Sequence, residues 1–194
     1  MRSHFTWFLI ILFIILAGAS FILTNKAKHV IIEKKQGVIH KLEKKTSMKI
    51  TSTAFENNSQ IPKKYTCDGE NINPPLAFED IPDTAKTLVL IVEDPDAPSK
   101  TWVHWILYNI SPNVKFINEG SAPSNAKQAL TDSGEPKYSG PCPPSGTHRY
   151  FFKLYALDEK LTDMPDFTDK PIIEAAMEGH IVGSAELIGL YSKE

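Results

Sequence analysis

The chain has 194 residues, of which 42% are hydrophobic and 23% charged, and its formal net charge is −2. This composition fits one globular domain with an added segment, or at most two small domains, and it can bury a core without disulfide staples. From residue 48 onward there are 13 basic and 21 acidic residues, a net charge of −8. An acidic body argues against binding to a phosphodiester backbone, so no nucleic-acid partner is expected.

An uncharged apolar stretch of 19 residues lies near the start of the chain, at residues 5–23. About 20 apolar residues in a helix are enough to cross a bilayer. The sequence AGA at 17–19 is also typical of a signal-peptide cleavage site, but the apolar stretch continues beyond it through residues 21–23. The pattern therefore favours an uncleaved signal anchor or transmembrane helix over residues 1–24.

A basic segment follows this stretch. Residues 26–45 contain seven lysines and two glutamates, and we interpret residues 25–47 as a basic juxtamembrane linker. Positive charge after the helix would keep the body in the cytoplasm, whereas a very short tail ahead of the helix favours export. We predict a single-pass membrane protein that contacts the membrane through its N-terminal helix, with an exported, periplasmic or extracytoplasmic body.

The body, residues 48–194, shows mostly strand patterns. Apolar and polar residues alternate at its start, and later runs are β-branched and apolar between turn signals. Strands are predicted at 48–55, 86–94, 101–110, 148–158 and 181–191. One helix is predicted at 171–180, with a proline suited to its first turn and a glycine to its C-terminal cap. Many strands, few helices and no βαβ rhythm indicate an all-β sandwich.

The chain has two cysteines, Cys67 and Cys142. They are too few for a disulfide scaffold or a four-cysteine zinc site. In an oxidising compartment they could pair and close a loop of about 75 residues, which the chain-entropy model values at roughly 4 kcal/mol. Two unpaired thiols are the alternative.

Two carboxylates follow the predicted strand 86–94, in the sequence EDPDAP. Pro95 favours an extended Asp94, and alternate residues of an extended segment point the same way. Asp94 and Asp96 are therefore expected to face one side. A plain turn is the alternative, because Asp and Pro are favoured turn residues.

A histidine interrupts the next apolar strand. Regular alternation would place His104 on one face with Trp102, Ile106 and Tyr108. A lone histidine in such a strand is more often a core or surface residue than a ligand-binding one.

A second histidine begins the strand 148–158, where His148 and Tyr150 share a face. The preceding sequence GPCPPSG carries three prolines, including Pro141, and is either a tight turn or the stiff wall of a site.

Three kinds of site could use two carboxylates, two imidazoles and a phenol. No HxH, HExxH or CxxC spacing supports a metal site. Nucleophilic catalysis would need an activated Ser or Cys, and a cysteine between two prolines fits a wall better. An anion pocket makes the fewest further demands, with the imidazoles, the phenol and backbone N–H groups as donors and the carboxylates orienting the imidazoles. These backbone donors would be Gly140, Cys142, Ser145 and Gly146. We assign no catalytic residue, no metal ligand and no cofactor.

Two long stretches, DPDAPSKTWVHWILYNI and GPCPPSGTHRYFFKLYALD, closely resemble the phosphatidylethanolamine-binding protein (PEBP) family, in its bacterial branch of Raf kinase inhibitor-like proteins. The stretches IPKKYTCDGENINPPLAF and AAMEGHIVGSAELIGLY are similar to the same branch. The resemblance spans about residues 48–191. It implies a PEBP-like sandwich of two antiparallel sheets with a few short helices, here preceded by the transmembrane helix. It also implies a small anion pocket formed by Asp94, Asp96, His104, Pro141, His148 and Tyr150.

The resemblance further implies a binding or regulatory protein rather than an enzyme. We therefore expect a membrane-tethered module that binds a small phosphorylated or anionic ligand. Two alternatives stay open. A hydrolase could use the Asp/His cluster as general acid and base, and an inhibitor of a kinase or protease would act through contacts with a protein partner.

Overall fold

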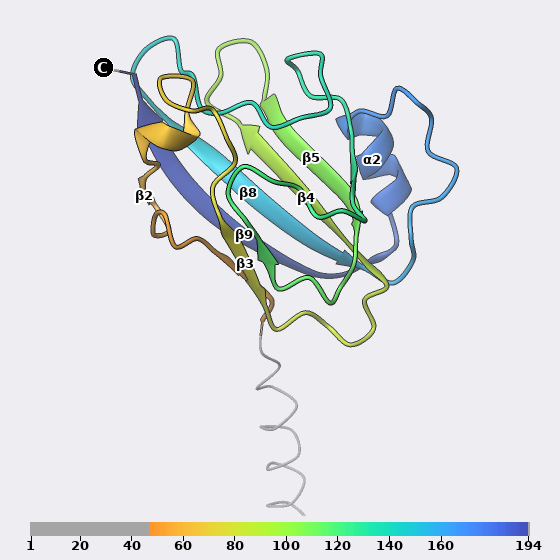
Figure 1. Ribbon diagram of the computed structural model, residues 1–194. Helices are drawn as coiled ribbons and strands as arrows, with labels where there is room; N and C mark the ends of the chain where they lie inside the picture. Colours follow the sequence, from red (N-terminus) through yellow and green to blue (C-terminus); the bar gives the residue numbers. More distant parts are fainter. Residues whose placement is uncertain (1–46, 194) are drawn as a thin grey trace, which may run out of the picture. The chain divides into compact units, whose positions relative to one another are not determined.

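Two β-sheets pack face to face in residues 47–193, the part of the chain that a computed structural model describes (Figure 1). The strands in chain order are β1 (Lys49–Thr51), β2 (Ser59–Gln60), β3 (Leu76–Glu79), β4 (Thr87–Asp94), β5 (Trp102–Ile110), β6 (Phe116–Ile117), β7 (Lys127–Gln128), β8 (Thr147–Leu157) and β9 (Ile181–Ser192). A 3-10 helix, η1 (Lys63–Tyr65), follows β2, and an α-helix, α2 (Lys170–Met177), precedes β9. The predicted mostly β architecture with short helices agrees with these elements.

The larger sheet has the order β2-β9-β8-β4-β5-β7, and the smaller has the order β1-β3-β6. The smaller sheet is antiparallel throughout. In the larger sheet β2 pairs with β9 in parallel, so the expectation of two purely antiparallel sheets is wrong at this edge. The short β2 reaches this position because it follows a connection from the smaller sheet rather than a hairpin with β9.

β4 lies at the centre of the fold, with all eight residues buried. Alternate residues of a strand point to opposite faces. Leu88, Leu90 and Val92 therefore pack toward the smaller sheet, whereas Val89 and Ile91 pack toward α2. Each fully buried side chain of this size contributes roughly 1.5–3 kcal/mol. Asp94 is the last residue of β4, so this central strand places it at the end of the larger sheet.

The helix α2 covers the second face of the larger sheet (Figure 1). Asp169 caps its first turn by accepting a hydrogen bond from the Ile172 amide at 3.3 Å, and Pro171 occupies the first turn. Ile173 and Met177 are buried against the sheet. Gly179, just past the C-terminus, has a φ of +80°, which favours glycine.

Two bulges interrupt β5. Val92 and Glu93 pair with Trp105 and Val103, so His104 is an extra residue in the ladder. A second irregularity, between Leu88 and Leu90 of β4, coincides with a φ of +57° at Asn109. Alternation through β5 is therefore broken, which sequence periodicity could not foresee. Ile106 and Tyr108 face α2 and do not share a face with His104.

The predicted membrane anchor is corrected. Among the described residues no helix is long and apolar enough to cross a membrane. The α-helix of this part, α2, has eight residues, about 12 Å in length, whereas a bilayer core is about 30 Å thick. The transmembrane helix at 1–24 and the linker at 25–47, apart from residue 47, lie outside the described residues. The single-pass, exported localisation predicted from them is therefore not supported.

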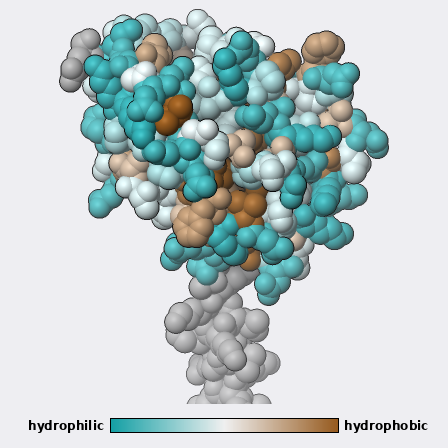
Figure 2. Space-filling model, viewed as in Figure 1, coloured by the Kyte–Doolittle hydropathy of each residue, from teal (hydrophilic) through white to brown (hydrophobic). Residues whose placement is uncertain are grey.

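The face of the molecule seen in Figure 2 is mostly hydrophilic, and its apolar side chains gather in small areas. Large hydrophobic side chains that are exposed in the described part are few and come from separate elements: Trp102, Phe116, Phe167 and Ile181. Among them, Trp102 begins β5, at the end of the loop that contains the sequence EDPDAP. It is the one that lies beside the predicted site.

Candidate functional site

A cavity of about 290 Å³ lies at the end of the larger sheet where β4 ends and β8 begins. Its walls come from the β4–β5 loop, the start of β5 and the loop ahead of β8. The lining residues are Asp94, Ala97, Pro98, Trp102, His104, Ser139, Gly140, Cys142, Pro143, Pro144 and His148. Three of the six predicted site residues are among them, namely Asp94, His104 and His148.

Asp94 and His148 form a buried pair in this wall. The Asp94 Oδ2 atom lies 2.7 Å from His148 Nδ1, and the two side chains are 5% and 9% exposed. Asp94 Oδ1 accepts a second hydrogen bond from the Asp96 amide at 2.8 Å. Because both carboxylate oxygens act as acceptors, the His148 ring is held with Nδ1 toward Asp94.

His104 reaches the same cavity through the bulge in β5. Its Nδ1 lies 2.6 Å from the Ser139 carbonyl oxygen, and its ring packs edge-on against Tyr150 at 5.2 Å between centroids. Burial lowers the pKa of His104, although the Ser139 carbonyl and the charge of Asp94 oppose this shift. A buried imidazole with a lowered pKa favours the neutral form.

Asp96 does not line the cavity. Its backbone amide bonds back to Asp94, which makes a tight turn of the kind favoured by Asp. Its carboxylate accepts hydrogen bonds from Arg149 Nε at 2.8 Å, from Nη2 at 2.7 Å and from the Arg149 amide at 2.9 Å. The Arg149 guanidinium lowers the pKa of Asp96 to about 2. The prediction that Asp94 and Asp96 face one side is wrong, because the segment between them turns instead of staying extended.

Tyr150 and Pro141 lie behind the lining residues. The Tyr150 side chain is fully buried, and its hydroxyl has no hydrogen bond of regular geometry among the described residues. The backbone of Cys142 is close enough to lower the pKa of Tyr150, but burial and the charge of Asp94 raise it well above its usual range. Pro141 is buried, and its carbonyl accepts the Cys67 amide at 3.1 Å.

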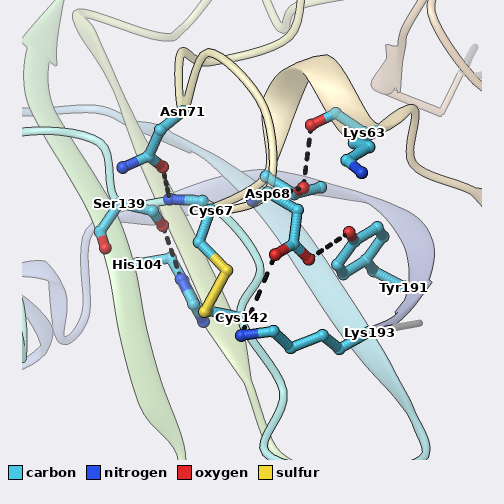
Figure 3. Close-up of a disulfide and its surroundings, with 11 residues drawn as sticks. Lys63, Cys67, Asp68, Asn71, His104, Ser139, Cys142, Tyr191 and Lys193 are labelled. Atoms are coloured by element: carbon cyan, nitrogen blue, oxygen red, sulfur yellow. Dashed lines mark hydrogen bonds and ion pairs between the residues drawn. A yellow bond between two sulfur atoms is a disulfide. The ribbon is translucent and has the colours of Figure 1, made fainter.

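The proline-rich loop is fixed to residues 65–71 by several bonds (Figure 3). Cys67 and Cys142 are joined by a disulfide with 5.5 Å between their Cα atoms. The Gly140 amide donates to Asn71 Oδ1 at 2.7 Å, and the buried Tyr138 hydroxyl donates to the Tyr65 carbonyl at 2.9 Å. These bonds hold Ser139, Gly140 and Cys142 in the cavity wall.

Asp68, beside the disulfide, ties this region to the end of β9. It accepts a hydrogen bond from the Tyr191 hydroxyl at 2.7 Å and forms an ion pair with Lys193 at 3.9 Å (Figure 3). Tyr191 pairs with His148 in the β8–β9 ladder. The wall thus has support from β9 as well as from the disulfide.

The expected backbone donors are mostly not available to a ligand. The Gly140 amide is occupied by Asn71. The Ser139 amide, which was not among the expected donors, donates to the His104 carbonyl at 2.9 Å. Ser145 and Gly146 do not line the cavity, and prolines have no N–H. No Lys or Arg is among the lining residues. The two imidazoles are therefore the basic groups of this cavity.

A larger, open groove of about 690 Å³ lies at the other end of β4. It is lined by Lys86, Lys115 and Lys160, together with Asp83 and Glu159 and six further residues. Its charged side chains are exposed and of mixed sign. Because it brings no buried acid–base pair together, we place the site at the smaller cavity. No cluster of three or more potential metal ligands occurs in the described part.

Several residues of the site carried no usable signal in the sequence. Ser139 acts through its carbonyl, which any residue would supply. Asn71 and Tyr138 act through contacts between segments about 70 residues apart. Arg149 could have been connected with Asp96 by its opposite charge, but its pairing depends on the turn at residues 94–96.

Comparisons with known proteins show the family and the fold of this chain. A family model described as phosphatidylethanolamine-binding protein matches residues 51–192. A protein of *Methanothermobacter thermautotrophicus* named UPF0098 protein is 50% identical over 151 residues, which cover 75% of this chain and 99% of that protein. A UPF0098 protein of *Chlamydia trachomatis* is 50% identical over 152 residues, which cover 76% of this chain and all of that protein.

Solved structures are similar as well. The crystal structure of a PEBP homologue, CT736 from *Chlamydia trachomatis*, is 48% identical with a TM-score of 0.73, covering 76% of this chain and 99% of that one. *Escherichia coli* YbcL, described as a new member of the mammalian PEBP family, is 25% identical with a TM-score of 0.72, covering 77% of this chain and all of that one. From the family match, these relatives and the shared fold, the chain belongs to the phosphatidylethanolamine-binding protein family.

Proposed function

We propose that this chain is a binding protein whose cavity takes a small oxyanion, such as the phosphate group of a larger ligand. The observation that carries the proposal is the convergence of His104 and His148 on one small cavity, each oriented through Nδ1. Members of the family are generally binding proteins, which favours a binding role for this one. Imidazoles are suited to phosphate oxygens because they can donate or accept a hydrogen bond near neutral pH.

The cavity walls suit a small polar group better than a large ligand. Pro98 stiffens one side, Pro143 and Pro144 stiffen another, and the disulfide at Cys142 fixes this second side to residue 67. A rigid cavity reduces the ordering cost of binding. Trp102 stands 37% exposed in this wall, where it can cover an apolar part next to the anion.

Calorimetry with phosphate compounds tests this proposal. His148→Ala should abolish measurable binding while the thermal unfolding still shows a folded protein. Asp96→Asn is the matched control, because Asp96 binds Arg149 and does not line the cavity. The affinity of the Asp96→Asn variant for phosphate compounds should change by less than about threefold, the effect expected when a surface ion pair is lost. Unchanged affinity in His148→Ala would show that the cavity is not the binding site.

The buried Asp94–His148 pair also favours a second candidate, a hydrolase. A carboxylate behind Nδ1 orients an imidazole so that its other nitrogen can take a proton from water, as a general base does. A panel of phosphate and carboxylate esters should then be hydrolysed by the protein and not by Asp94→Asn. Absence of turnover across the panel would contradict the hydrolase and leave only the binding role.

A further inference from the structure

We infer, resting on the proposed anion site, that the cavity selects oxyanions that carry a proton of their own, and that His148 takes up one more proton when such an anion binds. Inorganic phosphate belongs to this class near neutral pH, and phosphate monoesters and phosphonates join it by taking up one proton. Sulfate and sulfate esters, which carry no proton near neutral pH, do not. The anion that fits the cavity depends on which nitrogen of each imidazole is already occupied.

The hydrogen bond of His104 fixes its tautomer. A carbonyl oxygen can only accept, so the Nδ1 that lies 2.6 Å from the Ser139 oxygen must carry the hydrogen. In the neutral ring Nε2 then has a lone pair and no hydrogen. The ring is 5% exposed, and burial favours its neutral form. His104 therefore offers a ligand an acceptor, not a donor.

His148 has the same orientation but a different neighbour. Its Nδ1 faces the Asp94 carboxylate, which is already fixed by the Asp96 amide at the other oxygen. A second proton on Nε2 would make a cation that stands 2.7 Å from a buried carboxylate. His148 is therefore the imidazole that can become charged, and its Nε2–H then donates to an anion.

The charges around His148 do not supply another cation to the cavity. From β4 comes Asp94. Asp96 of the following loop and Arg149 of β8 are bound to each other. From β9 comes Tyr191, whose hydroxyl donates to Asp68, and Lys193 is paired with Asp68 as well. Two further titratable groups lie near the cavity. One is His104, whose ring packs against Tyr150. The other is Asp132, which lies on the His104 side and forms an ion pair with Lys100.

Two requirements follow for an anion in this cavity. Next to the Asp94 charge the anion is repelled unless His148 is protonated, so the bound state requires a proton on both nitrogens of His148. The anion also faces the lone pair on Nε2 of His104, to which it must donate a hydrogen bond. A P–OH group can donate this bond, and a sulfate cannot. An unmatched lone pair in a buried site disfavours the wrong ligand strongly. Together these requirements define the ligand class.

Calorimetry on the full chain with inorganic phosphate and with sulfate tests both parts. At pH 6 phosphate should bind at least about tenfold more tightly than sulfate. In His104→Asn the side-chain amide can still donate to the Ser139 carbonyl, but the acceptor at Nε2 is gone. The preference for phosphate should then fall to about threefold or less.

The number of protons taken up when phosphate binds is measured by calorimetry at pH 8, in two buffers of different ionisation enthalpy. Phosphate alone can gain about one proton on binding, so an uptake clearly above one proton per bound phosphate requires a group of the protein. His148→Asn keeps a donor toward Asp94 and should lose this extra uptake together with most of the affinity. His180→Asn is the control, since His180 forms a similar pair with Asp158 at 3.0 Å but lies 40% exposed and away from the cavity.

The outcomes separate the two proposals. Failure of both anions to bind at either pH would overturn the anion site itself and the inference with it. Equal affinity for phosphate and sulfate, or an uptake of one proton or less, would overturn the inference and leave the anion site standing. Unfolding midpoints of the three variants, compared with the unchanged chain, show whether a loss of binding reflects a loss of fold.

Discussion

Two buried tyrosines near the cavity place their hydroxyl groups in opposite situations. The Tyr138 hydroxyl donates to the Tyr65 carbonyl at 2.9 Å, whereas that of Tyr150 has no regular hydrogen bond among the described residues. Burial raises the pKa of both phenols well above the usual range, so both stay neutral. A buried polar group without a partner costs stability, and one with a partner contributes to it.

The same substitution should therefore have opposite effects at the two positions. Tyr138→Phe should lower the free energy of unfolding by about 1–2 kcal/mol, because the Tyr65 carbonyl loses its donor. Tyr150→Phe should leave it unchanged or raise it by up to about 1 kcal/mol. Urea denaturation of both variants measures this. An equal loss in Tyr150→Phe would mean that the Cys142 amide donates to the Tyr150 oxygen in solution.

If the Tyr150 hydroxyl binds the ligand, its removal should weaken ligand binding and should not lower the free energy of unfolding. Tyr150→Phe is then expected to weaken phosphate binding by a factor of about five or more, equivalent to one lost hydrogen bond. Tyr138→Phe, whose hydroxyl points to Tyr65, serves as the comparison.

At the scale of elements, α2 is attached to the sheet by charge as well as by its apolar face. Glu93, 5% exposed, accepts a hydrogen bond from Lys153 at 2.6 Å. Lys170 at the start of α2 lies 2.5 Å from the other carboxylate oxygen, an ion pair without regular hydrogen-bond geometry. Burial raises the pKa of Glu93, but the two lysines outweigh it, and the net pKa is lowered.

Glu93→Gln should destabilise the protein by about 2 kcal/mol at pH 7, because two partly buried ammonium groups lose their counter-charge. A carboxyl with a lowered pKa contributes stability above its unfolded pKa of about 4 and loses it as pH falls through the folded value. The difference between Glu93→Gln and the unchanged chain should therefore shrink below pH 4. Urea titrations at pH 7 and pH 3 measure it.

The matched control is Glu174→Gln. Glu174 contacts the same Lys170 at 3.4 Å but is 54% exposed, so its loss should cost no more than about 0.5 kcal/mol. A similar loss of unfolding free energy in both variants would show that the burial of Glu93 does not strengthen its ion pairs.

At the scale of the whole molecule, the disulfide joins two loops that lie 75 residues apart. The loop it closes contains β3 to β7, so it spans both sheets. Cys67→Ser with Cys142→Ser should lower the free energy of unfolding by about 4 kcal/mol if unfolded-chain entropy dominates. The hydrogen bonds from Gly140 and Tyr138 remain, so the loop should stay near its place and phosphate affinity should fall only a few-fold. A loss of all binding would show that the disulfide itself shapes the cavity.

Much of this architecture could be predicted from the sequence, because apolar runs such as residues 86–94 have one stable position, the centre of a sheet. Asp94 and His148 could be placed in the site since each marks a strand end. Asp96 could not, because its direction depends on whether residues 94–96 turn or extend, and both were allowed locally. The tautomers of His104 and His148 depend on distant partners, Ser139 and Asp94, which no local pattern reveals.

The bulge at His104 has a consequence for how such a site can arise. In an unbroken strand one residue of each neighbouring pair faces the core, so a polar side chain there displaces an apolar one. Here His104 serves the cavity while the next residue, Trp105, is 1% exposed in the core and packs against Tyr138. A single inserted residue thus places a histidine in the cavity wall without removing an apolar residue from the core. The bulge lets position 104 face the cavity while β5 stays paired with β4 on either side of it.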